Sequence, residues 1–133
     1  MREERVDKIT KYWITHAEYD LETAKAMYKS RRYLYVTFMC QQAVEKLLKG
    51  RIASVSSITP PRTHNLVRLA EIANLVDKLG PKQVSLMAEL TPFCIESRYA
   101  DYQEKMSKLT NRKLAAAYLE KTKALFKWLK KTA

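Results

Sequence analysis

The sequence has few of the residues that interrupt helices. Its 133 positions include two glycines and four prolines, whereas folds rich in β-turns need many of both, because glycine supplies left-handed conformations and proline fixes tight turns. No stretch approaches the roughly 18 consecutive apolar residues of a transmembrane helix. The charged N-terminal segment MREERVDK lacks the apolar stretch of a signal peptide. These absences favour a helical, cytoplasmic protein with no membrane partner.

Cysteine and histidine are equally scarce, and this limits the chemistry that the chain can perform. Cys40 and Cys94 lie in apolar surroundings without the Cys-x-x-Cys spacing of a redox or zinc site, so we expect two reduced, buried thiols. The histidines are His16 and His64, too few for a typical zinc site. The motifs HExxH, Walker A, GxGxxG and GxSxG are absent. We therefore expect no metal and no cofactor.

What the chain has in excess is positive charge. The formal net charge is +11, and residues 105–133 include nine lysines and arginines against one acid, Glu120. Such a bias favours polyanionic partners, including RNA, DNA and nucleotide phosphates. A lysine-rich surface that only keeps a protein in solution has the same composition. Charge alone therefore leaves both interpretations open.

Apolar residues recur every three or four positions along most of the chain, which is the period of a helix. The pattern fades in the polar segment 97–103, which we interpret as irregular. The predicted helices span residues 3–29, 33–54, 64–79, 80 to about 92, and 110 to about 130. No repeat and no second domain is evident, so we expect a single domain over 1–133. Its fold class is all-α, an up-and-down bundle of four to five helices whose first two form a long antiparallel pair.

The second predicted helix carries polar residues that are not scattered over its surface. At 100° per residue, Gln42, Glu45, Lys46 and Lys49 fall within one narrow stripe. The opposite half of this helix is apolar and supplies its contact with the core. The stripe is therefore a solvated surface, a ligand site or a subunit interface.

Further polar residues occupy unusual positions. Asp20 falls inside the apolar stripe of the first predicted helix, where burying an unpaired carboxylate is costly, so we expect it to be paired or to face a polar cleft. His64 follows a Pro-Pro loop at a predicted helix start, where backbone amides can meet an anion; a capping role is the alternative. Arg98, Tyr99 and Asp101 suit phosphate contact and base stacking, although Arg98 and Asp101 can also pair locally.

In order and spacing, these elements resemble the HEPN domain family (higher eukaryotes and prokaryotes nucleotide-binding). The matching stretches are QAVEKLLK at 42–49, THNL at 63–66 and ESRYAD at 96–101, together with Trp13, Ala17 and Asp20 on the first predicted helix. The resemblance implies a helical bundle with a polar cleft between the first helices and the segment after the fourth. It also implies a nucleotide- or RNA-related function, often beside a minimal nucleotidyltransferase in a toxin–antitoxin pair.

Carried over residue by residue, the resemblance assigns nucleotide or phosphate contacts to one set of positions and a structural role at the cleft to Asp20. The contact positions are Gln42, Glu45, Lys46, Lys49, His64, Arg98, Tyr99 and Asp101.

The sequence departs from the pattern of the ribonucleases in this family. Many members are metal-independent ribonucleases in which an arginine is followed four to six residues later by a histidine, but residues 103–105 after Arg98 are Gln, Glu and Lys. We therefore expect a binding protein rather than an enzyme. One alternative is a ribonuclease with an unconventional site that uses His64 and Arg98. Another is a pure interaction module, because bundles of this family tend to form homodimers and Tyr35 and Phe38 suit an interface.

Overall fold

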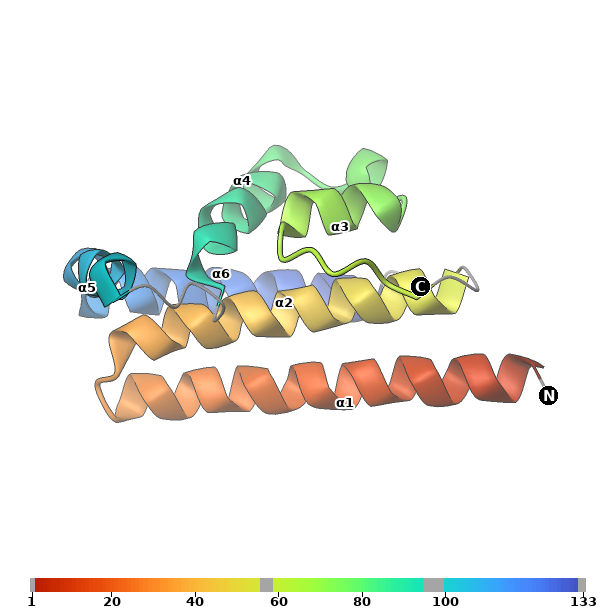
Figure 1. Cartoon of the computed structure of the whole chain (residues 1–133), viewed down its shortest axis with the longest axis horizontal. Coiled ribbons are helices and arrows are strands. Elements are labelled where there is room, and N and C mark those ends of the chain that lie inside the picture. Colours follow the sequence, from red (N-terminus) through yellow and green to blue (C-terminus); the bar gives the residue numbers. More distant parts are fainter. Residues whose placement is uncertain (1, 56–58, 95–99, 132–133) are drawn as a thin grey trace.

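A computed structural model describes residues 2–55, 59–94 and 100–131. Within these ranges the chain forms six α-helices, two 3-10 helices and no β-strand. The bounds are α1 Arg2–Lys29, α2 Tyr33–Val55, α3 Leu66–Ile72, η1 Val76–Lys78, α4 Pro81–Leu90, η2 Thr91–Phe93, α5 Ala100–Leu109 and α6 Arg112–Lys131. None of the helices in this described part is both long and apolar enough to cross a bilayer. The all-α class and the long antiparallel pair α1–α2 are confirmed (Figure 1).

A left-handed residue reverses the chain between α1 and α2. Arg31 has a φ of 64°. Its N–H donates to the carbonyl of Tyr28 at 3.1 Å, and the N–H of Arg32 donates to the carbonyl of Met27 at 2.9 Å. This is the Schellman arrangement, which satisfies carbonyls at the end of a helix and usually has glycine at the left-handed position. The turn allows α2 to run back along α1.

The two long helices approach each other closely at Gly50. A Cβ atom placed on Gly50 would lie 2.7 Å from the Cβ of Trp13 on α1, which is nearer than two carbon atoms can pack. The absence of a side chain at this buried position therefore permits the observed contact between α1 and α2.

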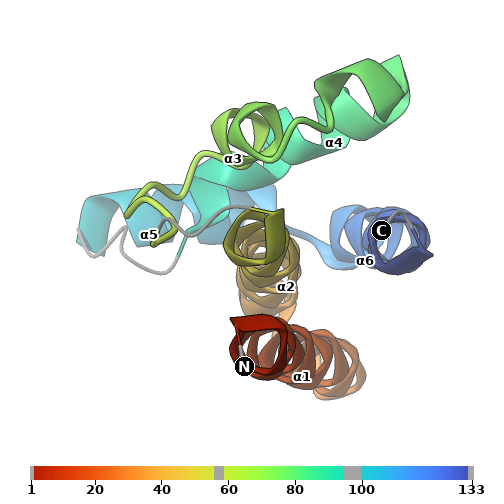
Figure 2. The same ribbon diagram turned by 90° about the vertical axis from the view of Figure 1, so that its right-hand side faces the viewer.

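α2 is the central helix of the fold. It contacts α1, α3, α4, α5 and α6, and Figure 2 shows α1 on one side of it, α3 and α4 on the opposite side and α6 beside it. Twelve of its 23 residues are buried. The expectation that only one half of this helix meets the core is therefore wrong, because helices packed on several sides also cover polar residues of α2.

The helix predicted over 64–79 begins later than expected. Asn65 is its N-cap, since its side-chain oxygen accepts the N–H of Arg68 at 3.2 Å. His64 thus precedes the cap and lies in the loop before α3. The predicted helix start at His64 is therefore two residues early, and the described contacts of His64 with Gln41 and Glu45 join this loop to α2.

The same predicted helix also ends early. Asn74 has a φ of 59°, a left-handed conformation that asparagine tolerates better than most residues. The turn at Asn74 places Leu75 in the core, 1% exposed, and leaves Val76 42% exposed. On a continuous helix, the apolar pattern would have placed Val76 inward.

Residues 100–103, predicted to be irregular, belong to α5. Among the described side chains of α5, at 104–109, Met106 is the buried one. An exposed helix needs few apolar residues, which fits the exposed side chains that surround Met106 at 104–109.

Contacts between aromatic rings connect α2 with η2, and η2 with α6. Phe38 is 2% exposed, and its ring centroid lies 6.4 Å from that of Phe93, which in turn lies 6.1 Å from that of Tyr118. Phe38 is thus a core residue and is unavailable to a subunit interface. Tyr35, the other residue suggested for an interface, is 49% exposed.

Candidate functional site

Glu45 is the centre of a group of polar side chains near the middle of α2. One carboxylate oxygen, Oε1, accepts a hydrogen bond from Gln41 Nε2 at 3.0 Å and lies 2.7 Å from His64 Nδ1. The other, Oε2, pairs with Lys49 Nζ at 3.1 Å. The Glu45 side chain is 7% exposed. Its three polar partners offset the cost of removing the carboxylate from water.

These partners also determine the charge state of Glu45. Burial by itself raises the pKa of Glu45, but hydrogen bonds from Gln41 and His64 and the charge of Lys49 outweigh it, so the pKa lies below its usual range. The carboxylate is therefore ionised at neutral pH. Because an ionised carboxylate can only accept, Nδ1 of His64 donates the hydrogen bond in this contact.

Helical spacing and one loop bring this group together. Gln41, Glu45 and Lys49 are four residues apart and lie on one side of α2. His64 comes from the loop before α3, and its backbone carbonyl accepts a second hydrogen bond from Gln41 Nε2 at 3.1 Å. Gln41 thus fixes the loop on α2 and positions the imidazole beside Glu45.

A cross-helix ion pair extends the group to α1. Lys46 Nζ lies 2.5 Å from Asp20 Oδ2, and the two side chains are 26% and 12% exposed. This is the pairing that the position of Asp20 in an apolar stripe requires. Gln42 donates to Gln41 Oε1 at 3.2 Å and is not the partner of Asp20.

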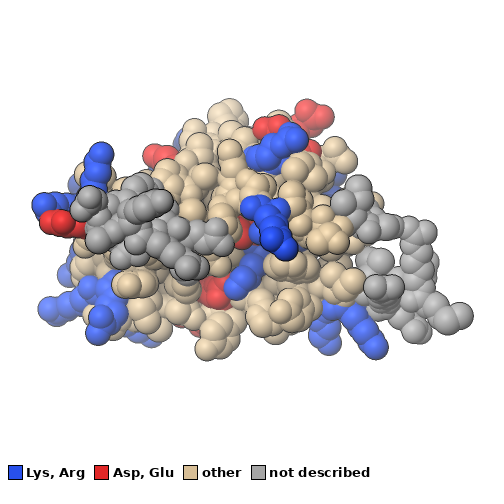
Figure 3. Space-filling view, viewed as in Figure 1, with Lys and Arg blue, Asp and Glu red and all other residues tan. Residues whose placement is uncertain are grey.

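We call the assembled residues the polar cluster. Two carboxylates, two ammonium groups and an imidazole are interleaved in it, so each charge has an opposite neighbour. In Figure 3, which looks onto α1, α2 and α3, basic and acidic side chains lie side by side near the middle of the face. The members of the polar cluster are Asp20, Gln41, Gln42, Glu45, Lys46, Lys49 and His64.

The structure brings together the predicted residues of α1, α2 and the His64 loop. Arg98 and Tyr99 lie outside the described residues, as does the side chain of Asp101 in α5. Their convergence on the polar cluster remains a prediction.

Gln41 is the member that the sequence interpretation missed. It is fully buried and connects Glu45, His64 and Gln42. The available signal was a glutamine at the border of the apolar half of α2, one turn before Glu45, where an unpaired amide would be costly.

A resident metal ion has no candidate site in the part of the chain that is described. Across 2–55, 59–94 and 100–131, no three His, Cys, Asp or Glu side chains are grouped as ligands.

Comparison with known proteins places this architecture in a family. The sequence profile of the HEPN domain matches residues 10–132, while no curated protein matches the chain. The crystal structure of TT1696 from Thermus thermophilus has a TM-score of 0.76 at 20% identity, over 93% of this chain and 98% of that one. That of ST0689, described as an archaeal HEPN homologue, has a TM-score of 0.66 at 19% identity, over 91% and 94%. These two likenesses concern the fold, and the profile match spans nearly all of the sequence. The protein therefore belongs to the HEPN domain family.

Proposed function

We propose that this protein binds nucleotides or RNA, with the polar cluster as its phosphate-binding site. The observation that carries the proposal is the way in which two largely buried carboxylates, Asp20 and Glu45, hold three nitrogen-bearing side chains in fixed positions. Those side chains belong to Lys46, Lys49 and His64. Family membership supports the ligand class, and the net charge of +11 attracts polyanions.

Lys46 and His64 are the groups best suited to meet a phosphate. Each side chain is 26% exposed, whereas that of Lys49 is 13% exposed. An ammonium group has three N–H donors, so Lys46 can keep its contact with Asp20 while another N–H donates to a phosphate oxygen. Since Asp20 already restricts Lys46, binding costs less side-chain entropy than it would for a free surface lysine.

A direct test measures the affinity of a labelled single-stranded RNA oligonucleotide by fluorescence anisotropy at increasing salt. The double variant Asp20→Asn/Lys46→Gln removes the ammonium but retains a hydrogen-bonding pair between α1 and α2. We expect its affinity for the RNA to be lower by about 10-fold or more, because a charge-assisted hydrogen bond to phosphate contributes about 1.5–3 kcal/mol. Asp20→Asn alone should bind about as tightly as the wild type, because the asparagine oxygen still accepts a hydrogen bond from Lys46 and keeps it in position.

The matched control is Lys127→Gln, which removes an exposed lysine of α6 far along the chain from the polar cluster. Its loss should be about 2-fold, through the general field alone. Equal losses for Lys127→Gln and the double variant would show diffuse electrostatic binding. No binding of RNA or nucleotide even at low salt would favour the interaction module instead.

One contact supports metal-independent RNA cleavage as a second candidate. A carboxylate on Nδ1 of a histidine orients the ring and stabilises its protonated form, as in base–orienter pairs of known enzymes. Glu45 makes this contact with His64. In such a reaction the imidazole of His64 would take the proton of a 2′-hydroxyl as that oxygen bonds to phosphorus and the bond from phosphorus to the 5′-oxygen breaks, and the 5′-oxygen would take a proton from water.

The variant His64→Asn separates binding from cleavage. Its amide N–H can still donate toward Glu45, but it has no group that titrates near neutrality. If the wild type cleaves RNA in the presence of a chelator and His64→Asn only binds it, the protein is a ribonuclease. If the wild type leaves RNA intact, the binding function stands alone.

Two finer proposals concern assembly. The family resemblance supports a minimal nucleotidyltransferase as the partner, in a toxin–antitoxin-like pair, and a homodimer of this chain. Large exposed aromatic side chains on the two long helices supply surface for an interface. They are Tyr12, Tyr19 and Tyr35, at 59%, 73% and 49% exposure. Sedimentation of the purified protein tests the dimer, and a compact monomer at micromolar concentration would exclude it.

A further inference from the structure

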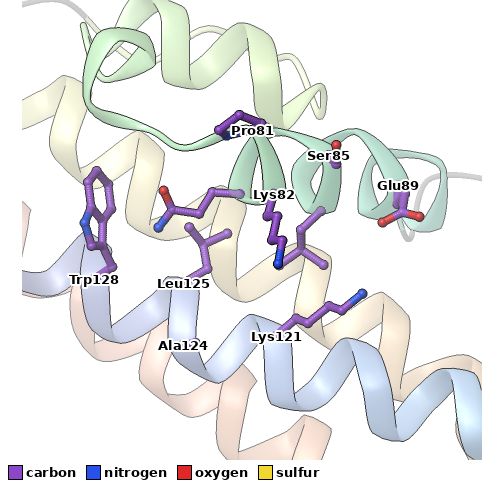
Figure 4. A pocket seen from close by; sticks show the side chains of 10 residues that line it. Pro81, Lys82, Ser85, Glu89, Lys121, Ala124, Leu125 and Trp128 are labelled. Atoms are coloured by element: carbon purple, nitrogen blue, oxygen red, sulfur yellow. The ribbon is translucent and has the colours of Figure 1, made fainter.

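A concave site lies between α4 and α6 and shares no residue with the polar cluster. It is a groove of about 610 Å³, within the roughly 300–1,000 Å³ of small-molecule sites. Figure 4 shows side chains from both helices directed into the space between them. Neither the family membership nor the proposed RNA contact assigns a role to this groove.

The floor and one end of the groove are apolar. Leu86 of α4 and Leu125 of α6 are buried, at 3% and 2% exposure, and form part of its lining. Trp128 lies at one end and is half-buried. An indole beside an aliphatic floor suits a flat aromatic group, which gains both apolar burial and ring contact there.

Cations from both helices line the same groove. Lys82 projects from the first turn of α4, and Lys121 lies on α6. Neither forms an ion pair with any carboxylate among the described residues. Glu89 also lines the groove but lies beyond ion-pair distance of both lysines. Two lysines against one acid leave this region with a net positive charge.

Helical spacing sets the size of the ligand. Lys121, Leu125 and Trp128 lie four and three residues apart, on one side of α6. Seven residues at 1.5 Å each separate Lys121 from Trp128 by about 10 Å. The facing wall, α4, has ten residues and is about 15 Å long. This length accommodates a small molecule and is short for a docked helix of several turns.

We propose that the groove binds a small aromatic anion, with its ring system against Trp128 and Leu125 and its anionic group at Lys82 and Lys121. The required chemistry is a flat apolar body of about two rings with a carboxylate or phosphate attached to it or within about 10 Å of it. An aromatic carboxylic acid and a mononucleotide both satisfy this description. The choice between them is a matter for the test.

Tryptophan fluorescence provides the readout. The chain has two tryptophans, so Trp13→Phe leaves Trp128 as the sole reporter, with circular dichroism as the check on folding. The probes are 1-naphthoate, AMP and the neutral 1-naphthalenemethanol. We expect at least one anion to change Trp128 emission saturably, and the neutral probe to bind about 10-fold more weakly. The anion that binds more tightly then shows whether the ligand is an aromatic carboxylic acid or a mononucleotide.

Charge reversal on α6 makes the test specific. In the same background, Lys121→Glu should weaken binding of the anionic probe about 10-fold or more, whereas Lys127→Glu, which is outside the groove, should change it about 2-fold at most. Equal effects of the two substitutions, equal binding of the neutral probe, or no saturable response up to about 1 mM would overturn the proposal. RNA affinity is measured on the same variants, and Lys121→Glu should alter it no more than Lys127→Glu.

Discussion

Replacing Glu45 by glutamine should destabilise the fold, and the structure predicts both the size of the loss and its dependence on pH. The side chain keeps its size, but one acceptor oxygen becomes an NH₂ donor. All three partners of Glu45, which are Gln41, His64 and Lys49, donate hydrogen bonds. The glutamine amide therefore places a donor opposite a donor. It also leaves Lys49, 13% exposed, without its counter-charge.

The expected loss of stability follows from these contacts. A hydrogen bond to a charged group contributes about 1.5–3 kcal/mol, and removing one member of a buried ion pair costs about 3–5 kcal/mol. The glutamine oxygen retains one of the acceptor contacts, so we expect a net loss of about 3 kcal/mol at neutral pH. For a chain of this size, that loss lowers Tm by about 10 °C.

The loss should depend on pH in one direction. The pKa of Glu45 in the folded protein is below the ordinary value of 4.5, so its ionised form stabilises the fold at pH values above the unfolded pKa. This contribution disappears as the pH falls through the lower, folded pKa. The difference between wild type and Glu45→Gln should therefore be largest near neutrality and shrink below pH 4.5.

Urea unfolding followed by far-ultraviolet circular dichroism measures both effects. Glu71→Gln is the control, because Glu71 forms an exposed pair with Arg68 at 3.3 Å, and exposed pairs contribute about 0–1 kcal/mol. A loss of stability for Glu45→Gln no larger than that for Glu71→Gln would contradict the role of Glu45 as a buried, paired carboxylate. A loss that stays constant as the pH falls would contradict the lowered pKa of Glu45.

Other substitutions test the packing, the thiols and the turn. Gly50→Ala should destabilise the fold by about 1–3 kcal/mol in urea melts despite its better helix propensity, because its Cβ overlaps Trp13; an unchanged midpoint would contradict this close approach. Burial raises the pKa of Cys40 to about 12. In the variant Cys94→Ala, a thiol reagent such as DTNB should therefore label Cys40 only after the protein unfolds. Rapid labelling of the folded protein would contradict the burial of Cys40. Arg31→Gly relieves a left-handed φ of 64° and should raise stability by about 1 kcal/mol in thermal melts; a loss would indicate that the arginine makes stabilising contacts.

The long helices could be predicted from their regular apolar periodicity. The bounds of the shorter helices were predicted wrongly because single residues set them. The bounds of α1 and α2 follow from apolar repeats over many turns. Asn65 and Asn74 begin and interrupt the third helical region through a cap and a left-handed turn, which the apolar pattern does not encode. α5 was missed because its sequence lacks an apolar repeat, and among its described side chains, at 104–109, Met106 alone is buried.

The same holds for the polar cluster. Neighbours on one helix could be predicted from their spacing, whereas contacts between distant segments could not. Spacing alone placed Glu45, Lys46 and Lys49 in one stripe, and the cost of burying a charge indicated that Asp20 needs a partner. The contact of Glu45 with His64 joins residues 19 positions apart. It depends on how the loop before α3 packs against α2, which a helical period cannot predict. Gln41 makes that packing possible, and its role became visible only with the tertiary fold.

Mapping the bound RNA on the folded protein tests the central claim most directly. In ¹H–¹⁵N correlation spectra recorded during titration with a short single-stranded RNA, the amides around Asp20, Lys46, Lys49 and His64 should shift most and saturate together. The titration should be repeated at higher salt, where binding weakens as phosphate contacts release counterions. Saturable shifts confined to α6, or small shifts at lysines over the whole surface, would contradict the assignment of the polar cluster as the phosphate-binding site.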